Sequence, residues 1–147
     1  MIFAKAILER TSMMIYRKNL SQKNKYKISK HRMMELRHFC YQYPDWKKEY
    51  LYFSYYPKTS EEEIKGTDAS DPTFILAEKR LRLSKKMEIV EQSVLEIAPD
   101  FYEAFLYGIT NDISYEAVKY RFDIPLSKAS YYRYYRKFFY ILDKKKW

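Results

Sequence analysis

Glycine is almost absent from this chain, and that scarcity limits the folds open to it more than any other feature. Only two of its 147 residues are glycine and five are proline, whereas sheets built from tight hairpin turns need glycine at positions of positive φ. The middle of the chain is instead rich in leucine, lysine, glutamate and alanine, which favour helices. We therefore predict an all-α fold and not a β-sandwich.

Large apolar residues recur every three or four positions between residues 36 and 53. The stripe consists of Leu36, Phe39, Tyr43, Trp46, Tyr50 and Phe53. This spacing lines one face of a helix. Pro44 lies within the stripe and leaves two interpretations open, because proline either kinks one helix or opens a second one in its first turn.

A second periodic segment follows the polar, acidic residues 57–72, which we expect to form a linker. Asp71 and Pro72 match the cap and the first turn of a long helix. That helix carries a heptad-like seam of Leu76, Leu83, Met87, Val90, Val94 and Ile97, with Arg80 as its one polar member. We predict that it packs against the aromatic stripe as an antiparallel helical hairpin.

Residues 100–107 predict a further short helix after Pro99, ended by the stretch from Gly108 to Ile113. Gly and the polar residues that follow it are typical of helix ends and loops.

The end of the chain predicts two helices joined by a tight break. Residues 114–122 form a short amphipathic helix, and residues 123–126 interrupt it. A longer basic helix follows over residues 127–142. Ser114 and Ser127 stand at the two N-cap positions, where a hydroxyl satisfies an orphan backbone amide. This layout is that of a helix-turn-helix, whose second helix enters the major groove of DNA.

Charge is separated along the chain. Residues 1–38 contain ten Lys/Arg and two Asp/Glu, and residues 119–147 contain nine and two. Residues 39–118 reverse the balance, with nine Lys/Arg and fifteen Asp/Glu. The formal net charge of the whole chain is +9. Two basic ends around an acidic middle indicate a phosphate-binding surface, for which duplex DNA is the expected partner. A basic tail without function is the alternative.

Helical spacing divides the last helix into two faces. The apolar face, which we expect in the core, holds Tyr131, Tyr132, Tyr135, Phe138, Phe139 and Leu142. The opposite, basic face holds Ala129, Ser130, Arg133, Tyr134, Arg136 and Lys137. A solvated basic face without a ligand is common, so each residue alone is a weak signal; the whole arrangement favours DNA binding.

The basic face supplies the candidate DNA-binding residues. Arg133 is placed to hydrogen-bond guanine O6 and N7, and Lys128 and Ser130 to meet base edges or phosphate near the helix N-terminus. Tyr134 is the one tyrosine expected to stack on a base or contact phosphate. Phosphate contacts are expected from Arg136, Lys137, Lys144, Lys145 and Lys146.

An enzyme is not expected. Two glycines do not build a phosphate loop, and no nucleophile is paired with a base. His31 and His38, with Cys40 nearby, have no familiar ligand spacing, so we expect no metal and no cofactor. A single cysteine and the absence of a long apolar run in the sequence predict a cytoplasmic protein without membrane contact.

Three parts result. We expect residues 1–30 to form a basic arm that is partly disordered, with Met13, Met14 or Met33 as an alternative start of translation. Residues 31–98 form the helical hairpin, and residues 99–147 the DNA-binding part.

Three segments of the sequence resemble one known family. The stretches Leu36–Trp46, Ser70–Thr73 and Ile124–Leu142 are similar to the RinA/ArpU-like phage transcriptional regulators. These are small all-helical proteins whose C-terminal part is similar to the promoter-reading domain of sigma factors. The resemblance runs from His31 to the end. It departs from sigma-like motifs at Pro125-Leu126, where those motifs often place a more polar pair.

The resemblance implies control of phage or prophage genes, often the late set, with host RNA polymerase as a further candidate partner. It maps Lys128, Ser130, Arg133, Tyr134 and Lys137 onto the recognition helix. The rival interpretation is a phage terminase small subunit, which also joins a helix-turn-helix to a hairpin and forms homo-oligomers. A third interpretation is a helical protein-interaction module that has no role in nucleic-acid binding. Operator sequence, activation or repression, and oligomeric state stay open.

Overall fold

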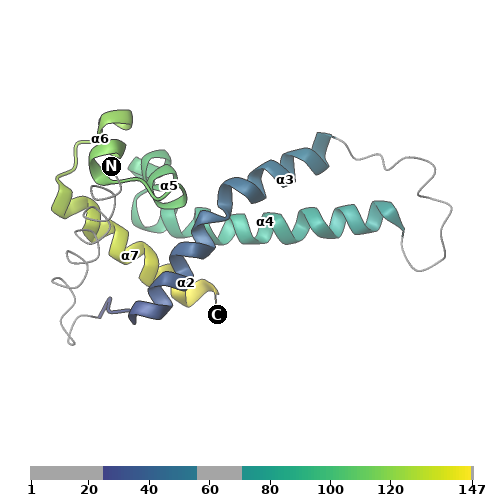
Figure 1. Ribbon diagram of the computed structural model, residues 1–147, viewed down its shortest axis with the longest axis horizontal. Helices are drawn as coiled ribbons and strands as arrows, with labels where there is room; N and C mark the ends of the chain where they lie inside the picture. The colour runs from purple at the N-terminus through teal and green to yellow at the C-terminus, as the bar shows by residue number, and fades with distance from the viewer. Residues whose placement is uncertain (1–24, 56–70, 147) are drawn as a thin grey trace, which may run out of the picture.

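Every regular element that the computed structural model contains within its described residues, 25–55 and 71–146, is helical (Figure 1). The elements are α2 (Lys30–Tyr41), α3 (Tyr43–Tyr55), α4 (Pro72–Ile97), the 3-10 turn η2 (Pro99–Phe101), α5 (Tyr102–Thr110), α6 (Tyr115–Phe122) and α7 (Lys128–Lys146). The all-α prediction is confirmed. Most of the predicted linker and of the basic arm lies outside the described residues.

The hairpin predicted from the two apolar stripes is formed by α3 and α4, which run antiparallel side by side (Figure 1). Trp46 is buried at its base and its ring packs edge-on against Phe39, with 4.9 Å between centroids. The Tyr43 hydroxyl donates a 2.8 Å hydrogen bond to Glu91 of α4. Pro44 is the second residue of α3, so the interpretation in which proline opens a new helix is confirmed.

Local caps determine where several helices begin. The Asp71 carboxylate accepts the N–H of Thr73 at 3.0 Å, and Ser114 accepts the N–H of Ala117 at 3.4 Å. Both caps were expected from sequence. Ser29 caps α2 by accepting the N–H of Arg32 at 3.3 Å. Each such side chain satisfies one of the amides that a helix start leaves unpaired.

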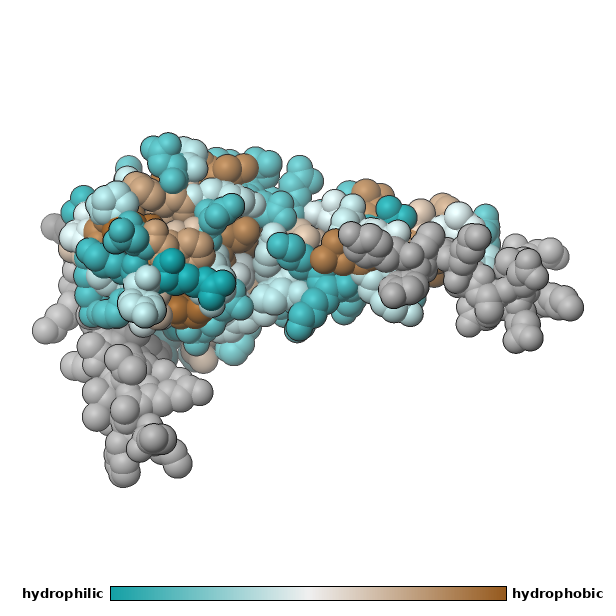
Figure 2. All heavy atoms as spheres, turned by 90° about the horizontal axis from the view of Figure 1, so that it is seen from above, coloured by the Kyte–Doolittle hydropathy of each residue, from teal (hydrophilic) through white to brown (hydrophobic). Residues whose placement is uncertain are grey.

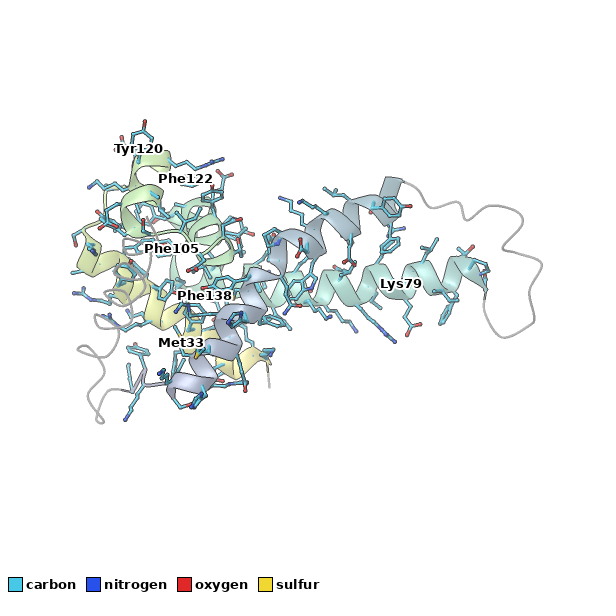
Figure 3. The ribbon with its side chains drawn as sticks, in the orientation of Figure 1. Met33, Lys79, Phe105, Tyr120, Phe122 and Phe138 are labelled. Atoms are coloured by element: carbon cyan, nitrogen blue, oxygen red, sulfur yellow. The ribbon has the colours of Figure 1, made fainter. Side chains whose placement is uncertain are left out.

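One core connects the base of the hairpin with the C-terminal helices. Its fully buried side chains come from different helices and include Leu36, Val90, Val94, Phe105, Val118, Phe138, Phe139 and Leu142. Phe105 and Phe138 lie at the centre of the body, between α2, α5 and α7 (Figure 3). Because α7 also packs along α4, the predicted hairpin and the predicted DNA-binding part share this core.

The prediction that Gly108 ends a helix is wrong. Helix α5 continues through Gly108 to Thr110 and ends at Asn111. Gly108 is buried where α5 approaches α6 and α7 closely, and a β-carbon there would lie 2.8 Å from Cγ2 of Val118. Glycine is present to permit this close packing and not to break the helix.

The hairpin projects away from the body that α2, α5, α6 and α7 form (Figure 1). Far from the core it exposes large apolar side chains among its charged ones: Leu51, Tyr52, Phe74, Ile75 and Leu81. Figure 2 shows hydrophobic and hydrophilic residues alternating along this projection.

Candidate nucleic-acid interface

The break between α6 and α7 is a defined turn. Asp123 adopts a left-handed conformation, with φ 51° and ψ 47°, and its N–H donates to the carbonyl of Lys119 at 2.8 Å. Ile124 is buried in the core, and the Tyr115 hydroxyl donates to the carbonyl of Leu126. These contacts tie both ends of the turn to α6, so the direction in which α7 begins is set by the core.

Ser127 caps α7 as predicted. Its hydroxyl accepts the N–H of Ser130 at 3.2 Å and donates to the Ser130 hydroxyl at 3.0 Å. Ser130 is half-buried. Its side chain therefore already has a partner at the position where a base-edge contact was predicted.

The predicted faces of the last helix are largely confirmed. Four residues of the apolar face are buried: Tyr131, Phe138, Phe139 and Leu142. Tyr132 and Tyr135 are half-buried beside them. On the opposite side Ala129 and Arg133 are exposed and Lys137 is half-exposed. No ion pair to Arg133 or Lys137 occurs among residues 25–55 and 71–146.

Tyr134 is not placed as predicted. Its ring is half-buried and packs edge-on against Phe105, with 5.6 Å between centroids. The residue lies three positions after Tyr131 and four before Phe138, so the helix turns it towards the core edge. The basic face therefore lacks the exposed aromatic side chain expected there for stacking on bases.

Two of the predicted phosphate-binding lysines have carboxylate partners. Lys128 Nζ lies 3.0 Å from Oε1 of Glu116, and Lys145 Nζ lies 2.5 Å from Oε1 of Glu96. The backbone N–H of Glu116, together with Lys128, holds the pKa of the Glu116 carboxyl below its usual range. The hydrogen bond between the Lys128 ammonium group and the Glu116 carboxylate raises the pKa of Lys128. Such exposed pairs are weak and exchange readily, but each must open before the lysine meets phosphate.

The remaining basic residues of α7 divide between its two sides. Lys144 lies with its Nζ 4.3 Å from the ring centre of Tyr140, on the same side as Lys137. Lys146 Nζ lies 4.5 Å from the ring centre of Phe39, and burial lowers the pKa of Lys146. Arg136 and Lys137 are equally of intermediate exposure. Lys137 and Lys144 lie on the outward side and form no ion pair with a carboxylate of residues 25–55 and 71–146.

Sequence reasoning missed a contribution from the segment before α2. The Tyr26 ring packs edge-on against Tyr140, with 5.2 Å between centroids and an interplanar angle of 86°. Arg32 Nε lies 2.5 Å from Oδ1 of Asp143. These contacts place residues 25–32 along the C-terminal half of α7. Residues 25–32, the described start of the N-terminal basic segment, are therefore neighbours of the basic helix α7.

The histidines and the cysteine do not form a site together. His31 and His38 are exposed on α2, as expected, whereas Cys40 is completely buried and burial raises the pKa of its thiol. In the two ranges that the structure describes, no group of three His, Cys, Asp or Glu side chains is placed to hold a metal ion.

Comparison with known proteins adds no relative: the chain matches no protein-family model, no curated protein and no solved structure. Within residues 25–55 and 71–146, no helix has both the length and the apolar character needed to cross a bilayer.

Proposed function

We propose that this chain is a sequence-specific duplex DNA-binding protein that regulates transcription of phage or prophage genes in the bacterial cytoplasm, without enzymatic activity. One observation carries the proposal: α7 buries its apolar face in the core and presents Arg133, Lys137 and Lys144 outwards. A helix held in this way has one face fixed in the core and directs the opposite face outwards.

The dimensions and chemistry of α7 suit the major groove. Its nineteen residues span roughly 28 Å, and the groove admits one α-helix. Ala129 and Ser130 are small, so the start of the helix can approach base edges closely. Arg133, one turn further on, is exposed and carries the fork of donors that matches guanine.

The charge of the helix and of the segment against it supplies the non-specific part of binding. Residues 127–146 contain seven Lys/Arg and one Asp, and residues 25–41 contain five Lys/Arg and one Glu. Neutralising phosphates with such residues releases counterions, so affinity falls steeply as salt rises. The phage regulator assignment rests on the resemblance of three segments, and host RNA polymerase is the protein partner that this resemblance implies.

The test is a gel-shift series on fragments of the genome that encodes the chain, repeated at increasing salt and followed by footprinting. We expect one or a few protected promoter sites and a negative slope of log affinity against log salt. Absent or salt-independent binding to every fragment would exclude the proposal.

A terminase small subunit is the second candidate, favoured by the projecting hairpin. Its exposed apolar side chains, among them Tyr52, Phe74 and Leu81, are of the kind that subunit contacts cover. Light scattering separates the candidates. A ring-sized homo-oligomer that binds packaging sites would support the terminase, and a monomer or dimer that protects a promoter would support the regulator.

A further inference from the structure

The segment that leads into α2 is fixed to the body of the protein. Ile28 is 8% exposed and belongs to the core, and Ser29 caps α2. Arg32, at the start of α2, pairs with Asp143 near the end of α7. Tyr26 is therefore held at a defined place, two residues before the buried Ile28.

Tyr26 packs on the outward side of α7. Its partner Tyr140 lies seven residues after Arg133 and three after Lys137, and these spacings place all three on one side of the helix. Lys144, one further turn along, has its Nζ 4.3 Å from the Tyr140 ring centre. The Tyr26–Tyr140 pair thus continues the surface that Arg133 and Lys137 begin.

Each ring of this tyrosine pair has a lysine ammonium group near it. Lys25 Nζ lies 4.9 Å from the ring centre of Tyr26, and Lys144 Nζ lies 4.3 Å from the ring centre of Tyr140. Lys25 and Lys27 are both exposed. Neither forms an ion pair with any carboxylate of the two described ranges.

We propose that Lys25 and Lys27, positioned by the packing of Tyr26 on Tyr140, bind the phosphate backbone beside the groove that α7 occupies. The inference rests on the proposed function. A helix lying in a groove has a phosphate strand along each of its sides, and contacts to that backbone fix the position and register of a protein on DNA. Tyr26 is a positioning residue, and the two lysines are the contacts.

The experiment measures fluorescence anisotropy of the full chain on one labelled duplex over a series of potassium chloride concentrations. The variants are Lys25→Ala/Lys27→Ala and Tyr26→Ala. Lys47→Ala/Lys48→Ala removes the same charge from exposed positions of α3 and is the matched control. Tyr26→Phe retains the ring contact. Thermal melts followed by circular dichroism show that each variant is folded.

We expect the slope of log affinity against log salt to become shallower by about 0.9 for each phosphate contact that Lys25→Ala/Lys27→Ala removes. Tyr26→Ala should make the slope shallower by part of this amount, although both lysines remain. Tyr26→Phe and the α3 control should bind like the parent chain.

Four results would overturn the inference. An equal loss of DNA affinity in the Lys25/Lys27 and Lys47/Lys48 variants would mean that binding depends only on the net charge of the protein. An unchanged slope in the first variant would mean that these lysines do not contact DNA, although the proposed function would stand. Stronger binding by Tyr26→Ala would mean that the segment shields α7. Failure of the parent chain to bind any duplex would remove the proposed function together with this inference.

Discussion

Gly108 of α5 leaves the space that the hydroxyl of Tyr131 in α7 occupies. A β-carbon at position 108 would lie 2.5 Å from Oη of Tyr131 and 2.8 Å from Cγ2 of Val118 in α6. The ring of Tyr131 also stacks on Phe105, with 4.7 Å between centroids. The distance between α5 and α7, and with it the placement of the basic face, therefore depends on a missing side chain.

Gly108→Ala should destabilise the protein by about 1–3 kcal/mol, because overpacking a dense core forces neighbouring groups to move. Helix propensity alone predicts the opposite sign, since alanine is favoured over glycine within a helix by up to ~1 kcal/mol. Chemical denaturation of the variant and the parent chain decides between the two effects. Unchanged or increased stability would contradict the close packing seen at this position.

Tyr131→Phe should leave the free energy of unfolding unchanged or raise it by about 1–3 kcal/mol. The Tyr131 hydroxyl is buried and has no hydrogen-bond partner among the described residues, and such a group carries its desolvation cost uncompensated. The control is Tyr115→Phe, which removes a hydroxyl that donates to the Leu126 carbonyl. It should lose about 0.5–1.5 kcal/mol. Equal losses in both variants would mean that the Tyr131 hydroxyl has a partner.

Phe139→Ala should act through folding and lower stability by about 3–5 kcal/mol, because the ring is completely buried. Tyr120→Ala is the control: that side chain is 92% exposed and points away from the body at α6 (Figure 3). Its loss should change stability by less than ~0.5 kcal/mol. A normal melting temperature for Phe139→Ala combined with lost DNA binding would mean that the faces of α7 are reversed.

Alkaline pH should destabilise the folded protein through two half-buried tyrosines, Tyr41 and Tyr135. Burial raises the pKa of Tyr41 to about 12 and raises that of Tyr135. The folded state therefore holds these phenol protons more tightly than the unfolded chain, whose tyrosines titrate near ~10. The resulting stability is complete below pH ~10 and is lost as the pH rises through about 12. Melting temperatures measured across this interval should fall; a constant value would contradict the burial of these hydroxyls.

Arg133→Ala and Lys137→Ala should weaken DNA binding in different ways while leaving the fold intact. Loss of Arg133 should relax preference at one or two base pairs by ~1–3 kcal/mol, because a bidentate guanine contact is lost. Loss of Lys137 should weaken all sequences about equally and flatten the salt dependence. Affinities for the footprinted site and for scrambled DNA measure both effects. Proportional losses in both variants would identify α7 as a general phosphate clamp.

The sequence alone determined the local features of this protein. Caps at Asp71, Ser114 and Ser127 were predictable because each side chain bonds to a backbone amide two or three residues away. The apolar faces of α3, α4 and α7 were predictable because helical geometry brings residues three and four apart together. These contacts are short-range, so the order of residues contains the information for them.

Only the tertiary structure decided which residues of the candidate site are available. Lys128 and Lys145 find carboxylates twelve and forty-nine positions away, and Tyr26 finds Tyr140 at the other end of the chain. Gly108, which looks like a helix end, is instead a point of contact between three helices. Such pairings arise when distant helices share one core, and no local spacing in the sequence predicts them.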